Sequence, residues 1–234
     1  MTKPIIAQVE SITPLTDSIL QIILKPAKYV DYQPGQYLQI LAPEGGLSYS
    51  IANAPLGSHQ YELHVRHSPD NLANQRLLAE IKQQGAVKIR IPQGHCHLDK
   101  LQANKPILFI AGGTGFAPIK AMIEQLLATS DSRAFELFWG ARSLSDLYMD
   151  EKVMQWQAHV KHFRYYSLLS NTSKETLASI ILDHHPKDLP QWQIVIAGPF
   201  DMVFAIRDSL VAHGVPREQL FSDAFAFEEI KGEE

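Results

Sequence analysis

The sequence predicts a two-domain protein of the β + α/β class, with an N-terminal antiparallel Greek-key β-barrel and a C-terminal parallel sheet flanked by helices. Two observations support this prediction. Short strand-like runs separated by Pro, Gly and Asp turns fill the chain up to residue 98, and strands alternate with helices beyond residue 105. At 234 residues the chain is long enough for two domains with their own cores. We place the domains at residues 1–101 and 102–234.

The first domain has the pattern of a small antiparallel barrel. Apolar and polar residues alternate along Tyr61–Arg66, which indicates one buried face, whereas Ile19–Leu24 is apolar on both faces. One helical insert is expected at Asn71–Lys82, where the shared face is only partly apolar. The expected strands are Ile5–Ile12, Ser18–Leu24, Tyr37–Leu41, Tyr49–Ala52, Tyr61–Arg66 and Ala86–Ile91.

The second domain alternates strands and helices at the spacing of a parallel sheet covered on both faces. Strands are expected at Ile107–Ala111, Phe135–Trp139, His162–Leu168 and Gln193–Ala197. Helices are expected at Phe116–Ala128, Asp150–Val160, Lys174–Asp183 and Asp201–His213. Ligands of such sheets bind at the carboxyl ends of the strands, so the segments that follow each strand are candidate binding elements.

The most informative of these segments is Gly112–Gly115, which turns a buried strand into a helix. Small residues let the backbone approach a pyrophosphate, and the first amides of the helix carry the positive end of its dipole. The turn matches neither the G-x-G-x-x-G fingerprint nor a phosphate loop, because no Lys follows the glycines. Taken alone it is equally consistent with a tight strand-to-helix turn that binds nothing.

Composition excludes several classes of function. The chain has 25 acidic residues and 21 Lys and Arg residues, which give a net charge of −4, and it has no basic block. This charge pattern disfavours a nucleic-acid partner. No apolar run reaches the ~20 residues of a membrane span, and the first residues lack the apolar segment of a signal peptide, so we expect a cytoplasmic protein without a membrane partner. The single Cys96 is too few for a Cys-ligated iron–sulfur cluster, and no metal site is expected.

Five short motifs, in order along nearly the whole chain, resemble those of the ferredoxin–NADP reductase superfamily, and most closely its NAD(P)H:flavin oxidoreductases. The motifs are Pro34–Tyr37, Leu47–Pro55, Ala111–Gly115, Ile196–Met202 and the aromatic tail Ser222–Phe227. The resemblance implies a ferredoxin–NADP reductase-like fold. It also implies a flavin site in the barrel and an NADH or NADPH site on the sheet.

The resemblance assigns residues to both sites. For the flavin they are Leu47, Tyr49, Ser50, Ile51, Ala52, His64, Val65 and Arg66. For NAD(P)H they are Ala111, Gly112, Gly113, Thr114, Gly115, Gly198, Pro199 and Met202, and the position of Arg142 after the second strand of the sheet adds that residue. In the family the aromatic residue at position 49 lies on the isoalloxazine, the Ser50 hydroxyl bonds flavin N5, and the strand containing 64–66 meets the flavin edge through its backbone. Ser50 is therefore the expected catalytic residue. If the motif is disregarded, the alternative is that Tyr49 only lines the barrel, Ser50 is a hydroxyl in a turn and Arg66 is a solvated strand residue.

One departure from the family motif bears on the flavin. The Arg that clamps the flavin phosphate is replaced by Leu47, which cannot make a charge-assisted hydrogen bond. Losing such a contact costs roughly 1.5–3 kcal/mol, or ~10–100-fold in affinity. The resemblance therefore implies a loosely bound flavin, whether riboflavin, FMN or FAD, that acts as a substrate.

The second departure concerns the nucleotide. NAD-selective sheets usually place an acid ~20 residues beyond the glycine turn, but Gly140–Ser143 carries none. Arg142 is positioned to pair with a 2′-phosphate, or it simply flanks a surface loop. We expect both NADH and NADPH to be used.

Two functions follow. The first is an NAD(P)H:flavin oxidoreductase that releases reduced flavin to a consuming enzyme or to ferric complexes. The alternative is an electron-transfer subunit that keeps FAD or FMN bound and reduces a partner oxygenase or dehydrogenase.

Overall fold

The computed structural model describes residues 3–42, 45–67 and 71–227. Contacts divide the chain into two compact units. The first comprises Met1–Leu98 together with Ala117–Ser130, and the second comprises Asp99–Phe116 and Asp131–Glu234. The expected boundary after residue 101 differs from this division in two respects: the first break falls after Leu98, and residues 117–130 group with the barrel.

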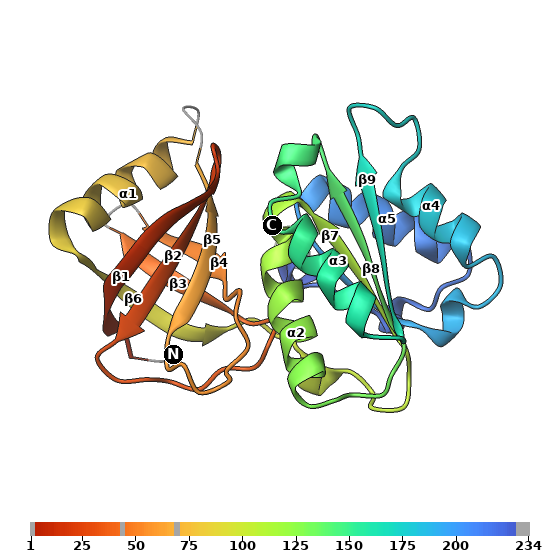
Figure 1. The fold of residues 1–234 in the computed structure, drawn as a ribbon, viewed down its shortest axis with the longest axis horizontal. Coiled ribbons are helices and arrows are strands. Elements are labelled where there is room, and N and C mark those ends of the chain that lie inside the picture. The colour runs from red at the N-terminus through yellow and green to blue at the C-terminus, as the bar shows by residue number, and fades with distance from the viewer. Residues whose placement is uncertain (1–2, 43–44, 68–70, 228–234) are drawn as a thin grey trace. The chain divides into compact units, whose positions relative to one another are not determined.

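The first unit is a six-stranded antiparallel sheet in the order β4-β3-β6-β1-β2-β5. A bridge between Ile51, just after β4, and Leu63 of β5 joins the two ends of this order, which confirms the predicted barrel (Figure 1). The strands are β1 (Ile5–Thr16), β2 (Ile19–Pro26), β3 (Tyr37–Ala42), β4 (Gly45–Ser50), β5 (Tyr61–Arg66) and β6 (Ala86–Gln93). The expected fourth strand, Tyr49–Ala52, lies earlier in the chain, because Gly45–Ser50 pairs with β3.

The predicted helical insert is α1 (Leu72–Gln84). The Asn71 side chain caps its start by accepting the Asn74 amide, and Gly85 ends it with a φ of 67°. Leu77 and Ile81 are buried in the barrel core, so the helix packs on the barrel by one narrow apolar face.

The second unit is a parallel sheet in the order β11-β10-β7-β8-β9. Its strands are β7 (Ile107–Gly112), β8 (Phe135–Ala141), β9 (Phe163–Leu169), β10 (Gln193–Ala197) and β11 (Leu220–Phe221). The helices that alternate with them are α2 (Phe116–Ala128), α3 (Asp150–His159), α4 (Leu177–His184) and α5 (Phe200–Ala212). The predicted α/β architecture is confirmed, with one addition: the two-residue strand β11 has no periodic pattern by which the sequence reveals it.

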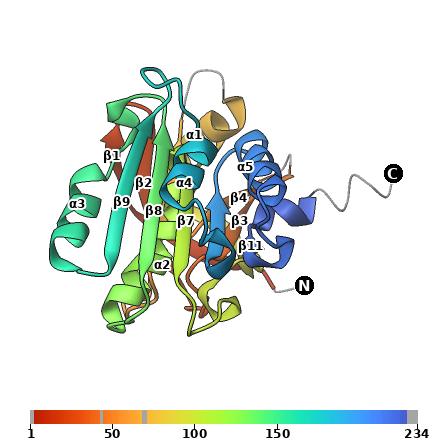
Figure 2. The same cartoon turned by 90° about the vertical axis from the view of Figure 1, so that its right-hand side faces the viewer.

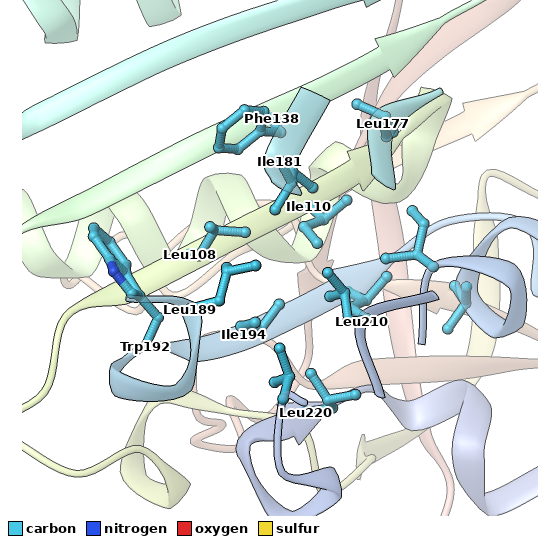
Figure 3. Packing of buried hydrophobic residues seen from close by; sticks show 14 of the residues in the cluster. Leu108, Ile110, Phe138, Leu177, Ile181, Leu189, Trp192, Ile194, Leu210 and Leu220 are labelled. Carbon is cyan, nitrogen blue, oxygen red and sulfur yellow. The ribbon is translucent and has the colours of Figure 1, made fainter. Parts of the chain in front are cut away.

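Apolar residues fill both faces of this sheet. On one face the strand residues Leu108, Ile110, Phe138 and Ile194 pack against α4 and α5 in a single buried cluster (Figure 3). Figure 2 shows α3 on the opposite side from α4 and α5. Successive side chains of a strand point to opposite faces of the sheet. The buried Phe109, which lies between Leu108 and Ile110, therefore belongs to the second face. Within the described residues, no helix is long and apolar enough to cross a membrane.

Candidate functional site

The glycine turn lies where the strand order of the parallel sheet reverses. The chain runs from β7 outward to β8 and β9, then returns to β10 on the other side of β7. β7 and β10 are neighbours, with Ala111 paired to Ala197, so their carboxyl ends place Gly112–Gly115 beside Gly198. Open α/β sheets bind ligands at such a switch point, which makes this edge the candidate dinucleotide site.

The shape of the turn is fixed by close backbone packing. Gly113–Gly115 forms one short helical turn that leads directly into α2, and Gly113 has a φ of 52°, where glycine is favoured. A Cβ at Gly115 would lie 2.1 Å from the Ala197 carbonyl oxygen, so only glycine fits there. The Trp139 indole donates to the Gly113 oxygen at 3.0 Å, and its ring stacks on Phe116 at 4.0 Å.

Met202 of α5 packs over the same edge. A Cβ at Gly112 would meet its sulfur at 2.4 Å, and a Cβ at Gly198 would meet its terminal methyl at 2.6 Å. Met202 thus fills the space that two absent side chains leave. Met202 was expected among the NAD(P)H residues, and its observed contacts are packing contacts. It limits how closely the loops at Gly112 and Gly198 approach each other.

These features fit a dinucleotide. The partly exposed residues 113–115 stand at the start of a helix, where the first amides have no intrahelical acceptor and carry partial positive charge. A pyrophosphate is the group such a turn accepts. Pro199 is exposed at the adjoining loop, whereas Ala111 is fully buried in the strand and only supports the turn.

An acid that the sequence analysis did not consider, Asp146, lies in the short helical turn that follows β8. The Arg142 side chain is 77% exposed, and its Nε lies 3.8 Å from Asp146 Oδ2. The same carboxylate accepts a hydrogen bond from Ser143 Oγ at 3.0 Å. Asp146 is the fourth residue beyond Arg142, so a short helical turn brings it back to the strand tip. Residues 140–143 themselves carry no acid, as expected from the sequence, but the buried and already bonded Asp146 lies close to Arg142.

In the barrel, Leu47 and Tyr49 lie beside the core and are partly buried. Leu47 pairs with Ile40 and Tyr49 with Leu38, both of them buried, and the two side chains pack against the barrel cluster. Apolar contacts therefore hold the Leu47 side chain, and its expected place at the flavin phosphate stays a prediction. Ile51 and Ala52, which follow, are completely buried.

Two hydrogen bonds in series hold the Tyr49 ring in place. Its hydroxyl donates to Asn74 Oδ1 on α1, and Asn74 Nδ2 donates to the Arg66 carbonyl on β5 at 2.6 Å. Burial raises the pKa of the Tyr49 phenol, so it stays protonated and keeps donating. Sequence reasoning missed Asn74, which has the appearance of a helix-surface residue.

Ser50 differs from Tyr49 in having an available hydroxyl. It is the last residue of β4 and is partly exposed. Within the described part of the chain, the Ser50 hydroxyl makes no hydrogen bond. It is therefore able to donate to a ligand without breaking a bond within the protein.

The backbone of β5 faces the same segment. Ala52 donates its amide to the Glu62 carbonyl at 2.7 Å, so the backbone groups of Glu62 point away from β2. In an antiparallel pair this orientation repeats every second residue, which directs the backbone groups of His64 and Arg66 along the same edge. Val65 lies between them with its side chain in the core. This backbone edge, at which the Arg66 carbonyl already accepts a hydrogen bond from Asn74, runs beside the segment that contains Ser50.

The side chain of His64 has another role. It is buried and its Nε2 lies 2.8 Å from the Glu62 carboxylate, which also bonds the buried Lys120 of α2 at 3.0 Å. Burial lowers the pKa of His64 and outweighs the opposing effect of Glu62, so the ring is neutral near pH 7. Sequence reasoning missed this cluster, although a single Lys within the apolar run Phe116–Ile123 is a detectable signal.

Comparison with known proteins gives sequence and structural relatives of the chain. Residues 109–208 match the oxidoreductase NAD-binding domain family. A CDP-6-deoxy-L-threo-D-glycero-4-hexulose-3-dehydrase reductase from Yersinia pestis is 32% identical over 89% of this chain, which spans 64% of that protein's length. A probable flavin reductase from Vibrio harveyi is 26% identical over 95% of this chain and 99% of its own length.

Among solved structures, the Amycolatopsis cytochrome P450 reductase GcoB has the same fold. It superposes with a TM-score of 0.83 and 24% identity, over 94% of this chain and 69% of its own. Residues 109–208 are therefore an oxidoreductase NAD-binding domain by sequence, and the chain as a whole is similar to flavin reductases and shares its fold with GcoB.

Proposed function

We propose that the protein is an NAD(P)H:flavin oxidoreductase that binds its flavin loosely and releases it after reduction. The reaction moves a hydride from nicotinamide C4 to flavin N5, chemistry that the two small molecules supply themselves. The protein supplies binding and orientation. Its relation to a probable flavin reductase over almost the full length of both chains supports this proposal.

The observation that carries the proposal is Leu47. An Arg at this position gives a phosphate a bidentate, charge-assisted clamp, whereas Leu47 packs against the barrel core. The barrel therefore lacks at this position the contact by which the family holds FMN or FAD. A flavin held by its ring alone leaves readily, which suits a substrate.

Named residues have distinct roles in this proposal. The Ser50 hydroxyl donates to N5 and orients the ring, and the backbone edge at His64 and Arg66 bonds its polar rim. Tyr49, held by Asn74, offers a fixed aromatic wall. On the parallel sheet, the Gly113–Gly115 turn binds the pyrophosphate, and Arg142 contacts the ribose at its 2′ position.

A second candidate rests on the relative of highest identity reported above, which is named as the reductase of a dehydrase. In that case the chain keeps a flavin bound and passes electrons to a partner enzyme. The two functions predict different purified proteins.

The discriminating experiment is purification followed by an assay. We expect a nearly colourless protein that oxidises NADH and NADPH only after riboflavin, FMN or FAD is added. A flavin that stays at one equivalent through gel filtration, with its yellow absorbance, would instead support the electron-transfer subunit.

Leu47→Arg tests the observation itself. The substitution should tighten FMN by about 10-fold or more and leave riboflavin unchanged, since only FMN has the phosphate that the guanidinium can bind. Leu47→Met is the matched control and should alter neither affinity. Equal changes for both flavins would show that residue 47 does not face the phosphate.

A further inference from the structure

Helix α2 contributes a fully bonded, buried ammonium group to the barrel unit. The Lys120 side chain is 2% exposed, and its three nitrogen-bound hydrogens have three acceptors. These are Glu62 Oε2 at 3.0 Å, Glu124 Oε1 at 2.9 Å and the carbonyl oxygen of Ala52 at 2.9 Å. Removing an ammonium from water is unfavourable by several kcal/mol unless such partners replace the water.

The carboxylate at the centre of the cluster is equally saturated. Besides Lys120, Glu62 accepts from Gln21 at 2.7 Å and from His64 at 2.8 Å. Burial raises the pKa of Glu62, but the hydrogen bond from His64 and the attraction of Lys120 outweigh burial and hold the pKa far below its usual range. The Glu62 carboxylate therefore stays ionised near neutral pH.

The cluster holds one short stretch of backbone, residues 52–54. Lys120 bonds the Ala52 carbonyl, and Glu124 Oε2 accepts the Ala54 amide at 3.3 Å. Between them, Asn53 Oδ1 accepts the Glu62 amide at 2.8 Å. This stretch begins two residues after Ser50 and pairs with the start of the β5 edge, the two elements that we assign to the flavin.

Stability alone does not explain the cluster. Well-packed apolar residues in place of a buried ion pair usually leave a protein equally or more stable, whereas charged partners fix directions and distances. Here the bonds from Lys120 and Glu124 to residues 52 and 54 both end on backbone atoms. The arrangement constrains where the chain runs, which is what a flat, weakly bound ring requires.

We infer that Lys120 and Glu124 are positioning residues for the flavin: by holding the backbone of residues 52–54, they keep the Ser50 hydroxyl and the His64–Arg66 backbone edge at the spacing the isoalloxazine ring needs. The inference rests on the proposed function, since it assigns a support to that same flavin site. It adds two residues that lie outside the flavin motif and touch no expected flavin atom.

The test measures flavin binding without turnover. Riboflavin fluorescence is titrated with wild type, Lys120→Met and Glu124→Ala, and NAD⁺ binding is measured by calorimetry on the same samples. Misplacing a binding group by a fraction of an ångström is expected to weaken riboflavin by about 10-fold in Lys120→Met and about 3-fold in Glu124→Ala. NAD⁺ affinity should stay constant. Lys82→Met, an exposed lysine of α1, controls for the lost charge and should change neither affinity.

Two outcomes would overturn the inference. One is an unchanged riboflavin affinity in variants that are folded by circular dichroism, and the other is an equal loss of riboflavin and NAD⁺ affinity, which indicates general damage. If Lys120→Met does not fold, Glu124→Ala decides alone, because its side chain is more exposed and Lys120 keeps Glu62. Wild-type turnover is a separate measurement: a wild type that reduces no added flavin refutes the proposed function, whereas an active wild type with unaffected variants refutes only the positioning role.

Discussion

The two proposed half-sites are built from different kinds of atoms. At the dinucleotide edge, backbone meets backbone: Gly115 has no room for a Cβ beside the Ala197 oxygen. At the flavin edge, buried charged side chains hold the backbone, with Lys120 and Glu62 at the centre. A site made by close backbone approach tolerates no added atom. A site held by side chains should weaken gradually as each bond is removed.

The largest expected effect is at the glycine turn. Gly115→Ala places a methyl 2.1 Å from a carbonyl oxygen that belongs to a buried strand, so the turn itself must move. We expect NAD(P)H binding to weaken by about 100-fold, because the helix amides no longer face the pyrophosphate. Isothermal titration with NAD⁺ measures it.

Gly57→Ala is the control for this substitution. Gly57 has a positive φ of 88°, which Gly115 lacks, but a Cβ at Gly57 meets nothing within 4 Å. Gly57→Ala should cost only about 1 kcal/mol of stability and leave nucleotide affinity unchanged. Equal losses of nucleotide affinity in the two variants would mean that the close approach at Gly115 does not determine nucleotide binding.

A smaller effect is expected at Ser50. If its unbonded hydroxyl meets N5 mainly during hydride transfer, Ser50→Ala lowers kcat by roughly 10-fold and changes the flavin KM little. Ser48→Ala, an exposed serine two residues earlier on the same strand, is the matched control. An unchanged kcat would remove Ser50 from the catalytic group.

Nucleotide choice should respond more weakly still. Arg142 is mostly exposed and shares Asp146 with Ser143, so its contact with a 2′-phosphate is solvated. We expect wild type to use both nucleotides, and Arg142→Ala to raise the KM for NADPH a few-fold, and that for NADH less. Strict use of NADH, or equal effects on both KM values, would show that Arg142 does not contact the 2′ position.

The smallest expected effect is on the pH dependence of stability, to which one histidine in each unit contributes. His185 lies 3.1 Å from Glu136 and 3.3 Å from Asp188; burial lowers its pKa, but these carboxylates outweigh it and the net pKa is raised. A raised pKa stabilises the fold fully below the ordinary value near 6.5, and this contribution is lost as pH rises through the folded value. For neutral His64 the sign is opposite, with stability lost as pH falls below 6.5.

Urea unfolding at pH 5.5 and pH 8 separates these two contributions. His185→Asn should reduce the loss of stability on the alkaline side, because it removes the group whose pKa folding raises. His64→Asn should reduce the loss on the acidic side. The same sign for both substitutions would contradict the assignment of opposite charge states.

The difference between the half-sites also explains what the sequence could predict. The glycine turn was predictable because only glycine fits such an approach, and the two domain classes followed from strand and helix periodicity. The expected roles of Leu47 and Ser50 came from a motif and stay predictions, although their burial and hydrogen bonding fit them. No spacing rule marks Lys120, because a helix lysine is usually solvated. Its partner Glu62 is 58 residues away in the chain, so the pair exists only after folding.

Asp146 and β11 escaped prediction for other reasons. Asp146 reaches the tip of β8 through a single short helical turn, a geometry that depends on where the chain goes next. Strand β11 has two residues, fewer than any alternation can reveal. Both are local details that tertiary context decides.

The short strand β11 covers one edge of strand β10. Leu220 and Phe221 pair with Ile194 and Val195, so they cover the hydrogen-bonding edge of an apolar strand that lies next to the end of its sheet. An uncovered apolar strand edge is a template onto which another molecule can add its own strand, and a two-residue edge offers very little to such an addition. Removing the chain from residue 220 onward would leave β10 as an open edge, and the shortened protein should form thioflavin-positive aggregates on mild warming while the intact chain stays dispersed.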